Sequence, residues 1–234
     1  MFAALVCRKC GRISRPEPPR RAARLCSDCV RVESVETVAT LHQSFDSILS
    51  RVPVTGRSYS GSVREVVADL KWRGRRSAAR ALGAELARSL LEAGVGGGAE
   101  AALRVDLVTW APTSDPRRRR RGYDQSELVA RDVARRMGLP CRRLLIRETG
   151  PTQTGLDRSR RLVNPRYRSR RLDSSVVLLV DDVVTTGATL RAAATALMRG
   201  GALDVVTAAP VATPSAFVAA ESRDPARGRA GSPS

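Results

Sequence analysis

Five apolar residues followed at once by two aspartates constrain the fold of this 234-residue chain more than any other feature. The apolar run is Val176–Val180, and three of its members are β-branched, which is typical of a parallel strand buried on both faces. Asp181 and Asp182 end the run, and a short loop of hydroxyl residues and glycine leads into a helical pattern over residues 189–198. This order of strand, loop and helix predicts an α/β fold with a parallel sheet.

The loop after this strand is suited to a phosphorylated sugar. In open α/β sheets, ligands bind at the carboxyl ends of the strands, where the two carboxylates are expected to lie. Backbone N–H groups at the start of a helix attract an anion, and Gly187 and Ala188 let a phosphate approach the main chain, with hydroxyls from Thr185, Thr186 and Thr189. Because carboxylates repel phosphate but bind vicinal hydroxyls, the pattern indicates a ribose 5-phosphate, with Mg²⁺ beside the acids. The plainer alternative is an exposed acidic pair before an ordinary helix.

The rest of the chain alternates helical and extended patterns, as a layered α/β protein requires. Apolar spacing predicts the following elements: helix over residues 62–93 with a break at 71–74, helix over 124–137, strands over 105–109 and 205–211, and early strands within 30–60. Residues 94–98 are expected to form a flexible loop, and residues 147–172 a mobile loop or short helix.

Four of the five cysteines form two C-x2-C knuckles. Cys7 and Cys10 are separated by 15 residues from Cys26 and Cys29. Two residues between paired cysteines let one turn aim both sulfurs at a metal, so the spacing predicts a structural Zn²⁺ with four thiolate ligands. Disulfides or unused thiols are the alternative, and an expected cytoplasmic location argues against disulfides. Cys141 stands alone and is expected to be a small, half-buried residue.

Several motifs occur together along residues 5–211. They are the cysteine knuckles, Leu-Lys-Trp-Arg-Gly at residues 70–74, Arg-Arg-Gly-Tyr-Asp-Gln-Ser at 120–126, a pattern of Arg, Gln and Asn within 147–164, and the acidic pair with its Thr/Gly loop. The last of these resembles the binding signature of the type I phosphoribosyltransferases, which bind phosphoribosyl pyrophosphate (PRPP). The combination resembles the ComF family, also called the competence protein F or GntX-like family.

This resemblance implies a role for each matching segment. Asp181 and Asp182 would hold the ribose hydroxyls, while Thr185, Thr186, Gly187, Ala188 and Thr189 would bind the 5-phosphate. Ala111, Pro112 and Thr113 would form the pyrophosphate loop. Gln153, Arg158 and Arg161 would lie in a loop that closes over PRPP, where arginine suits a phosphate. Mg²⁺ would accompany PRPP.

The chain also departs from the pattern of this family. The family usually has Asn where this chain has Asp124, which adds a negative charge beside an expected anion site. In purine-salvage relatives an acid begins the phosphate loop and serves as the base, but Thr185 occupies that position here, which disfavours a purine acceptor. His42, the single histidine, is interpreted as structural. No other general base is evident, so catalysis stays open.

Positive charge is concentrated in one part of the chain. The formal net charge is +18, and residues 116–171 hold eighteen basic and five acidic residues, which implies polyanionic ligands. Three interpretations of the run Arg117–Arg121 stay open: contacts to a nucleic-acid backbone, guidance of pyrophosphate, or a solvated charged loop. Aromatic residues for base stacking are few, since they make up 3% of the chain.

These patterns define three segments and one function. We expect a zinc-binding, zinc-ribbon-like module over residues 1–35, a phosphoribosyltransferase-like domain over 36–212 and a disordered tail over 213–234. The expected function is a cytoplasmic PRPP-binding protein of the ComF type, acting in DNA uptake (competence) or DNA metabolism. The alternative is a non-catalytic adaptor with a nucleotide-sensing site that binds zinc and nucleic acid, with single-stranded DNA and helicase-like or DNA-uptake proteins as candidate partners. The sequence patterns do not identify an acceptor substrate or an oligomeric state.

Overall fold

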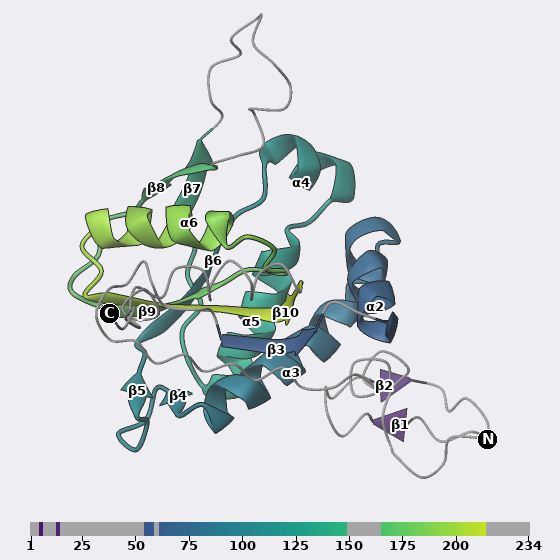
Figure 1. Cartoon of the computed structure of the whole chain (residues 1–234), viewed down its shortest axis with the longest axis horizontal. Helices are drawn as coiled ribbons and strands as arrows, with labels where there is room; N and C mark the ends of the chain where they lie inside the picture. Colours follow the sequence, from purple (N-terminus) through teal and green to yellow (C-terminus); the bar gives the residue numbers. More distant parts are fainter. Residues whose placement is uncertain (1–4, 7–12, 15–53, 59–60, 149–164, 214–234) are drawn as a thin grey trace, which may run out of the picture.

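A parallel four-stranded sheet forms the centre of the protein (Figure 1). The structure is a computed structural model, and it describes residues 5–6, 13–14, 54–58, 61–148 and 165–213. The strands are β3 (Val54–Ser58), β6 (Leu107–Trp110), β9 (Val176–Val180) and β10 (Asp204–Ala212), in the spatial order β3-β10-β9-β6. All three pairings are parallel, so the carboxyl ends of these strands point the same way. The predicted α/β fold with a parallel sheet is thereby confirmed.

Helices cover both faces of this sheet. On one face α2 (Gly61–Trp72), α3 (Ser77–Glu92) and α5 (Gln125–Met137) contribute buried residues to a shared apolar core. On the other face α6 (Ala188–Arg199) covers β9 and β10. Figure 1 shows α6 and α3 on opposite sides of the sheet. The sheet is therefore the middle layer of three, as expected for β-strands joined by helical crossovers.

The alternation of side chains along β9 explains why its sequence is continuously apolar. Leu178 and Val180 enter the core beneath α3 and α5, whereas Val177 and Leu179 enter the core beneath α6. Successive side chains of a strand point to opposite faces, so a strand covered on both sides needs apolar residues at every position.

Strand β10 pairs with its two neighbours, β9 and β3, along different halves of its length. Its first half, Asp204–Ala208, pairs with β9, and its second half, Ala208–Ala212, pairs with β3. Val54 at the start of β3 and Val180 at the end of β9 are thus both aligned with Ala208. As a result, β3 extends past the carboxyl end of β9 by four residues, or about 13 Å.

Three short segments differ from the sequence prediction. The arginine run is not a loop, because residues 115–121 form the helix α4 (Asp115–Arg121), which begins with a proline near its first turn and ends at Gly122 in the left-handed conformation. Residues 147–172 include strand: β7 (Leu145–Glu148) pairs antiparallel with β8 (Arg166–Ser169). The glycine-rich segment includes β4 (Val95–Gly96), which pairs with β5 (Leu103–Arg104). Few apolar residues mark these elements, so periodicity missed them.

The longer predicted elements are confirmed to within a few residues. The helix over 62–93 is interrupted near Gly74, whose φ is +68°, as the motif at 71–74 predicts.

A further antiparallel pair, β1 (Leu5–Val6) and β2 (Ile13–Ser14), lies near the amino terminus. None of the helices in the described ranges combines the length and apolar character needed to span a membrane. The three segment boundaries stay predictions.

Candidate functional site

The two aspartates lie at the carboxyl end of β9 and are fixed by the main chain on both sides. The Asp181 N–H donates to the Ala208 carbonyl at 3.0 Å, and after the acidic pair the Val184 N–H donates to the Val211 carbonyl at 2.9 Å. The strand therefore pairs with β10 before and after Asp181 and Asp182. This arrangement leaves the two carboxylates at the edge of the sheet, where the sequence predicts them.

Asp181 is the more buried of the two acids, with 8% of its surface exposed. Its Oδ1 accepts hydrogen bonds from Ser126 Oγ and from the Asp182 N–H, both at 2.9 Å. Burial, together with repulsion from the Asp182 carboxylate, raises the pKa of Asp181 to about 7, although these two hydrogen bonds and Lys71 oppose the shift. The carboxylate thus titrates near neutral pH, and both described donors contact the same oxygen.

Asp182 forms an ion pair with a residue from the other side of the site. Lys71 Nζ, in the last turn of α2, lies 2.9 Å from Asp182 Oδ2. The two side chains are 25% and 14% exposed, so water only partly screens the attraction. This contact joins α2 to the end of β9 and places one positive charge against the acidic pair.

The predicted phosphate loop connects Val184 to α6. Gly187 takes a φ of +71°, a left-handed conformation that favours glycine, and α6 begins at Ala188. The Ala188 N–H reaches Thr186 Oγ1 at 3.4 Å, and Arg191 Nη1 donates to the Thr186 carbonyl at 2.8 Å. Thr185 and Thr186 are exposed. The loop therefore combines a helix start, exposed hydroxyls and a nearby guanidinium, which together suit a phosphate.

The predicted pyrophosphate loop lies beside the acidic pair because β6 and β9 are neighbours. The Ala111 N–H donates at 3.0 Å to the carbonyl of Val180, the residue before Asp181. Next in the chain, the Thr113 N–H donates at 2.8 Å to Asp124 Oδ2, and Tyr167 Oη donates at 3.4 Å to the Pro112 carbonyl. The loop is thus held by side chains from both the start of α5 and β8.

Asp124 is a buried carboxylate and not a surface charge that faces an anion. It is 3% exposed, and its second oxygen, Oδ1, has no hydrogen-bond partner in the described part of the chain. Burial raises the pKa of Asp124, while the N–H groups of Thr113 and Glu127 oppose the rise. The residue therefore supports the 111–113 loop from inside the protein, and its charge is the third negative charge at this edge.

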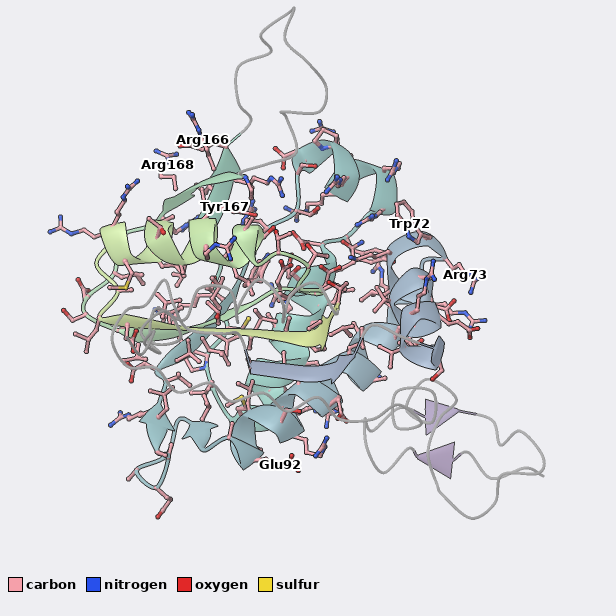
Figure 2. All side chains as sticks on the ribbon, in the orientation of Figure 1. Trp72, Arg73, Glu92, Arg166, Tyr167 and Arg168 are labelled. Carbon is pink, nitrogen blue, oxygen red and sulfur yellow. The ribbon has the colours of Figure 1, made fainter. Side chains whose placement is uncertain are left out.

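Tyr167, with Arg147 beside its ring, and Arg121 complete the surroundings of the acids. Burial raises the pKa of Tyr167 to about 12, so its hydroxyl stays protonated, and its ring lies 5.8 Å from the Arg147 guanidinium. Tyr167 alternates along β8 with Arg166 and Arg168, which are exposed (Figure 2). Arg121 donates to Gln125 Oε1 at 2.9 Å, and burial lowers the pKa of its guanidinium.

Sequence reasoning missed three residues that the structure brings to this edge: Lys71, Ser126 and Tyr167. Lys71 and Ser126 belong to motifs that carried the family resemblance, but spacing alone gave them no contact with the acids. Lys71 carried one further signal, because it is one of two lysines among 41 basic residues. Tyr167 lies in a segment with no helical or strand periodicity.

Several predicted site residues lie outside the described residues. They are the cysteines at 7, 10, 26 and 29, and Gln153, Arg158 and Arg161 of the closing loop; the histidine at 42, interpreted as structural, lies outside them too. Within the described ranges, no group of three or more His, Cys, Asp or Glu side chains is arranged to hold a metal ion. Cys141 is half-buried with a free thiol, and burial raises its pKa to about 11, in keeping with a structural role.

Comparison with known proteins identifies the class of this domain. Residues 124–223 match the family model of the phosphoribosyl transferase domain. That segment includes Asp124, the acidic pair and the phosphate loop. The chain therefore carries a phosphoribosyltransferase domain over these residues.

The solved structures that match the chain have low similarity to it. An allosteric regulatory enzyme of purine biosynthesis is 25% identical with a TM-score of 0.38, over 58% of this chain and 25% of its own, so the chain spans a quarter of its length. A protein from Thermus thermophilus is 23% identical with a TM-score of 0.38, over 62% of this chain and 79% of its own. Adenine phosphoribosyltransferase from Leishmania donovani is 18% identical with a TM-score of 0.38, over 69% of this chain and 64% of its own. No curated protein matches the chain in sequence.

The raised pKa of Asp181 predicts a specific dependence of stability on pH. Between its ordinary pKa of 3.8 and about 7, the folded protein holds a proton at Asp181 that the unfolded chain releases. This group therefore favours folding less and less as the pH rises through that range. Asp181→Asn removes the ionisation, so we expect it to increase the free energy of unfolding more at pH 8 than at pH 5, measured by urea denaturation. The exposed Asp173→Asn is the control, and an equal effect of Asp181→Asn at both pH values would contradict the assignment.

Proposed function

We propose that this protein is a PRPP-binding phosphoribosyltransferase of the ComF type. The observation that carries the proposal is the convergence of three features at one edge of the sheet: the Asp181–Asp182 pair, the loop that begins α6, and the 111–113 loop. Two carboxylates suited to a ribose diol lie between the start of a helix and a second loop. This arrangement matches the order of groups in PRPP, which has a 5-phosphate, a ribose diol and a pyrophosphate. The match of residues 124–223 to a phosphoribosyl transferase domain supports this assignment.

Each part of PRPP would meet groups of suitable charge. The ribose hydroxyls would donate to Asp181 and Asp182, whose described donors leave one oxygen of each carboxylate to a ligand. The 5-phosphate would accept hydrogen bonds from the start of α6. Mg²⁺ fits this site as a companion of PRPP, because it is typically held by one or two carboxylates together with substrate phosphates. It would neutralise charge on the pyrophosphate.

Transfer requires little covalent chemistry from the chain itself. The bond between ribose C1 and the pyrophosphate oxygen breaks, its electron pair leaves with pyrophosphate, and a nucleophile attacks C1. Positioning and electrostatic stabilisation of the leaving group are then the main contributions of the site. Thr185 begins the phosphate loop without an ionisable side chain. We therefore propose an acceptor that needs no base at this position, such as an amine. We also propose a cytoplasmic location, where PRPP is available.

Asp182→Asn is predicted to weaken PRPP binding. Loss of a charged hydrogen-bond acceptor for a ribose hydroxyl should lower the affinity about tenfold to a hundredfold. Isothermal titration calorimetry with PRPP and Mg²⁺ measures this directly. Asp173→Asn, an exposed carboxylate before β9, is the matched control and should bind PRPP as the unmodified protein does. If the unmodified protein folds but binds no PRPP, the proposal is wrong.

A second candidate function is a nucleic-acid-binding adaptor in DNA uptake or metabolism, with the PRPP site as a sensor. It is favoured by the surface formed by α4 and the end of α2. Arg117–Arg120 are exposed on α4, and the adjoining Trp72 is 67% exposed. Arg120 and Arg121 lie over the Trp72 ring, at 5.5 and 4.8 Å from its centre. Figure 2 shows Trp72 at the end of α2 that faces α4. Positive charge beside an exposed aromatic ring suits a single-stranded nucleic acid.

Replacing Arg117, Arg118 and Arg119 with serine tests this surface. If these side chains contact phosphates, affinity for single-stranded DNA should fall, and the slope of log K against log salt should become shallower by about two units. Fluorescence anisotropy across a salt series measures both quantities. The control replaces Arg142, Arg143 and Arg199, which are exposed elsewhere, with serine. Equal slopes for the two triple variants would exclude a specific role for α4.

We also propose that the four amino-terminal cysteines bind one structural Zn²⁺. The paired strands β1 and β2 support this, because the six residues between them in sequence include Cys7 and Cys10. A short hairpin joined by a C-x2-C segment is compatible with a four-cysteine zinc site.

Cys10→Ser is predicted to lose this metal. The purified protein should contain about one zinc per chain, and the variant well below that, since removing one thiolate opens the tetrahedral site. Elemental analysis by mass spectrometry measures the content, with Cys141→Ser as the control that should retain zinc. A zinc-free unmodified protein purified without chelators would contradict the proposal.

A further inference from the structure

The last turn of α2 is fixed to the site by three consecutive residues. The Leu70 carbonyl accepts a hydrogen bond from the buried Tyr123 hydroxyl. The Trp72 ring packs against Arg121, and between these two contacts Lys71 reaches Asp182. Tyr123 and Arg121 both belong to the segment that follows the 111–113 loop. The position of Lys71 is therefore set by the same segment that forms one side of the proposed pyrophosphate subsite.

The turn beyond α2 is also well held. Asp69 is 1% exposed, and its carboxylate accepts a hydrogen bond from Arg73 Nη1 at 2.8 Å. The Arg75 N–H donates to the Asp69 carbonyl at 3.1 Å, and Gly74 supplies the left-handed residue between them. With the main chain constrained in this way, the Lys71 ammonium can move by side-chain rotation without displacing the helix.

The sheet separates the surroundings of Lys71 from the 5-phosphate loop. Leu70 and the three valines of α2 pack in the core on the α3 and α5 face. Val184 and Leu190, which flank the phosphate loop, pack in the core beneath α6 on the opposite face. A ligand that spans the sheet edge would thus place its 5-phosphate toward α6 and its other end toward Lys71.

The charge at this end favours a mobile cation. Asp181, Asp182 and Asp124 gather three carboxyl groups, and Lys71 is the cation in direct contact with the Asp181–Asp182 pair among the described residues. These acids would repel a pyrophosphate group brought here, and an ammonium facing it would reduce that repulsion in addition to the Mg²⁺ that accompanies PRPP. A lysine ammonium is a compact charge on a flexible stem, so it can exchange a carboxylate for a phosphate oxygen.

We propose that Lys71 is a specificity-determining residue of this site, which pairs with Asp182 in the free protein and contacts the pyrophosphate group when PRPP is bound. Its ammonium distinguishes PRPP from ribose 5-phosphate, because ribose 5-phosphate lacks the group that Lys71 binds. For ribose 5-phosphate, Lys71 only competes with the ribose hydroxyls for Asp182. This inference rests on the proposed PRPP site and adds a residue that selects among its ligands.

Lys71→Met separates these roles. Calorimetric titration would use PRPP, inorganic pyrophosphate and ribose 5-phosphate, each with Mg²⁺. Loss of one charge-assisted contact should lower the affinity for PRPP and for pyrophosphate about tenfold or more. Affinity for ribose 5-phosphate should stay equal or increase, because Asp182 is released. Arg199→Met removes a positive charge at the far end of α6 and should leave all three affinities unchanged.

The outcomes of this experiment are distinct. A selective loss of PRPP and pyrophosphate binding supports the assignment. An equal change for all three ligands, or tighter PRPP binding, would show that Lys71 only neutralises or blocks Asp182 and would overturn it. If the unmodified protein binds none of the ligands, the proposed function fails and the role of Lys71 with it. Circular dichroism would confirm folding, and Lys71→Gln, which keeps a hydrogen-bond donor beside Asp182, replaces the Met variant if that variant does not fold.

Discussion

Repulsion among carboxylates at one edge of the sheet is the constraint on which the arrangement of this site depends. Two adjacent acids follow strand β9, and Asp124 adds a third from the position just before α5. Partial burial makes each negative charge costly, so the surrounding elements supply compensation: a hydroxyl from Ser126, main-chain N–H groups and the ammonium of Lys71. Helices α2 and α5 are therefore joined to the sheet by polar contacts as well as by apolar packing.

These polar contacts depend on a core that is divided in two by the sheet. Every residue of β9 after the first is buried, and alternate side chains belong to separate apolar clusters. The two loops at the strand ends consequently begin from fixed positions, with Val184 and Ala111 both packed in the core beneath α6. The protein can thus hold both loops beside one acidic pair, with little need for the loops to adjust their relative positions.

The sequence predicted those parts of the molecule in which local pattern and tertiary structure agree. The apolar run of β9, the acidic pair and the long helices α2, α3, α5 and α6 were readable because their periodicity reflects burial. The strand β8 and the helix α4 were not, since Arg166–Ser169 and Arg117–Arg121 carry charge rather than apolar spacing. Lys71 and Ser126 were unreadable as site residues for another reason: they reach Asp182 and Asp181 across 111 and 55 positions of sequence, and no local signal encodes a long-range polar contact.

The stagger of β10 between its two neighbours has a consequence for this site that extends beyond the strands themselves. Because β3 pairs with the second half of β10, β3 ends four residues beyond the end of β9, whereas the last turn of α2 contacts Asp182. A slip of β3 by one residue would displace this helix by about 3.3 Å, which is as large as the separation that joins Lys71 to Asp182. The electrostatic balance of the acids therefore depends on main-chain register at the outer strand, through the position of α2.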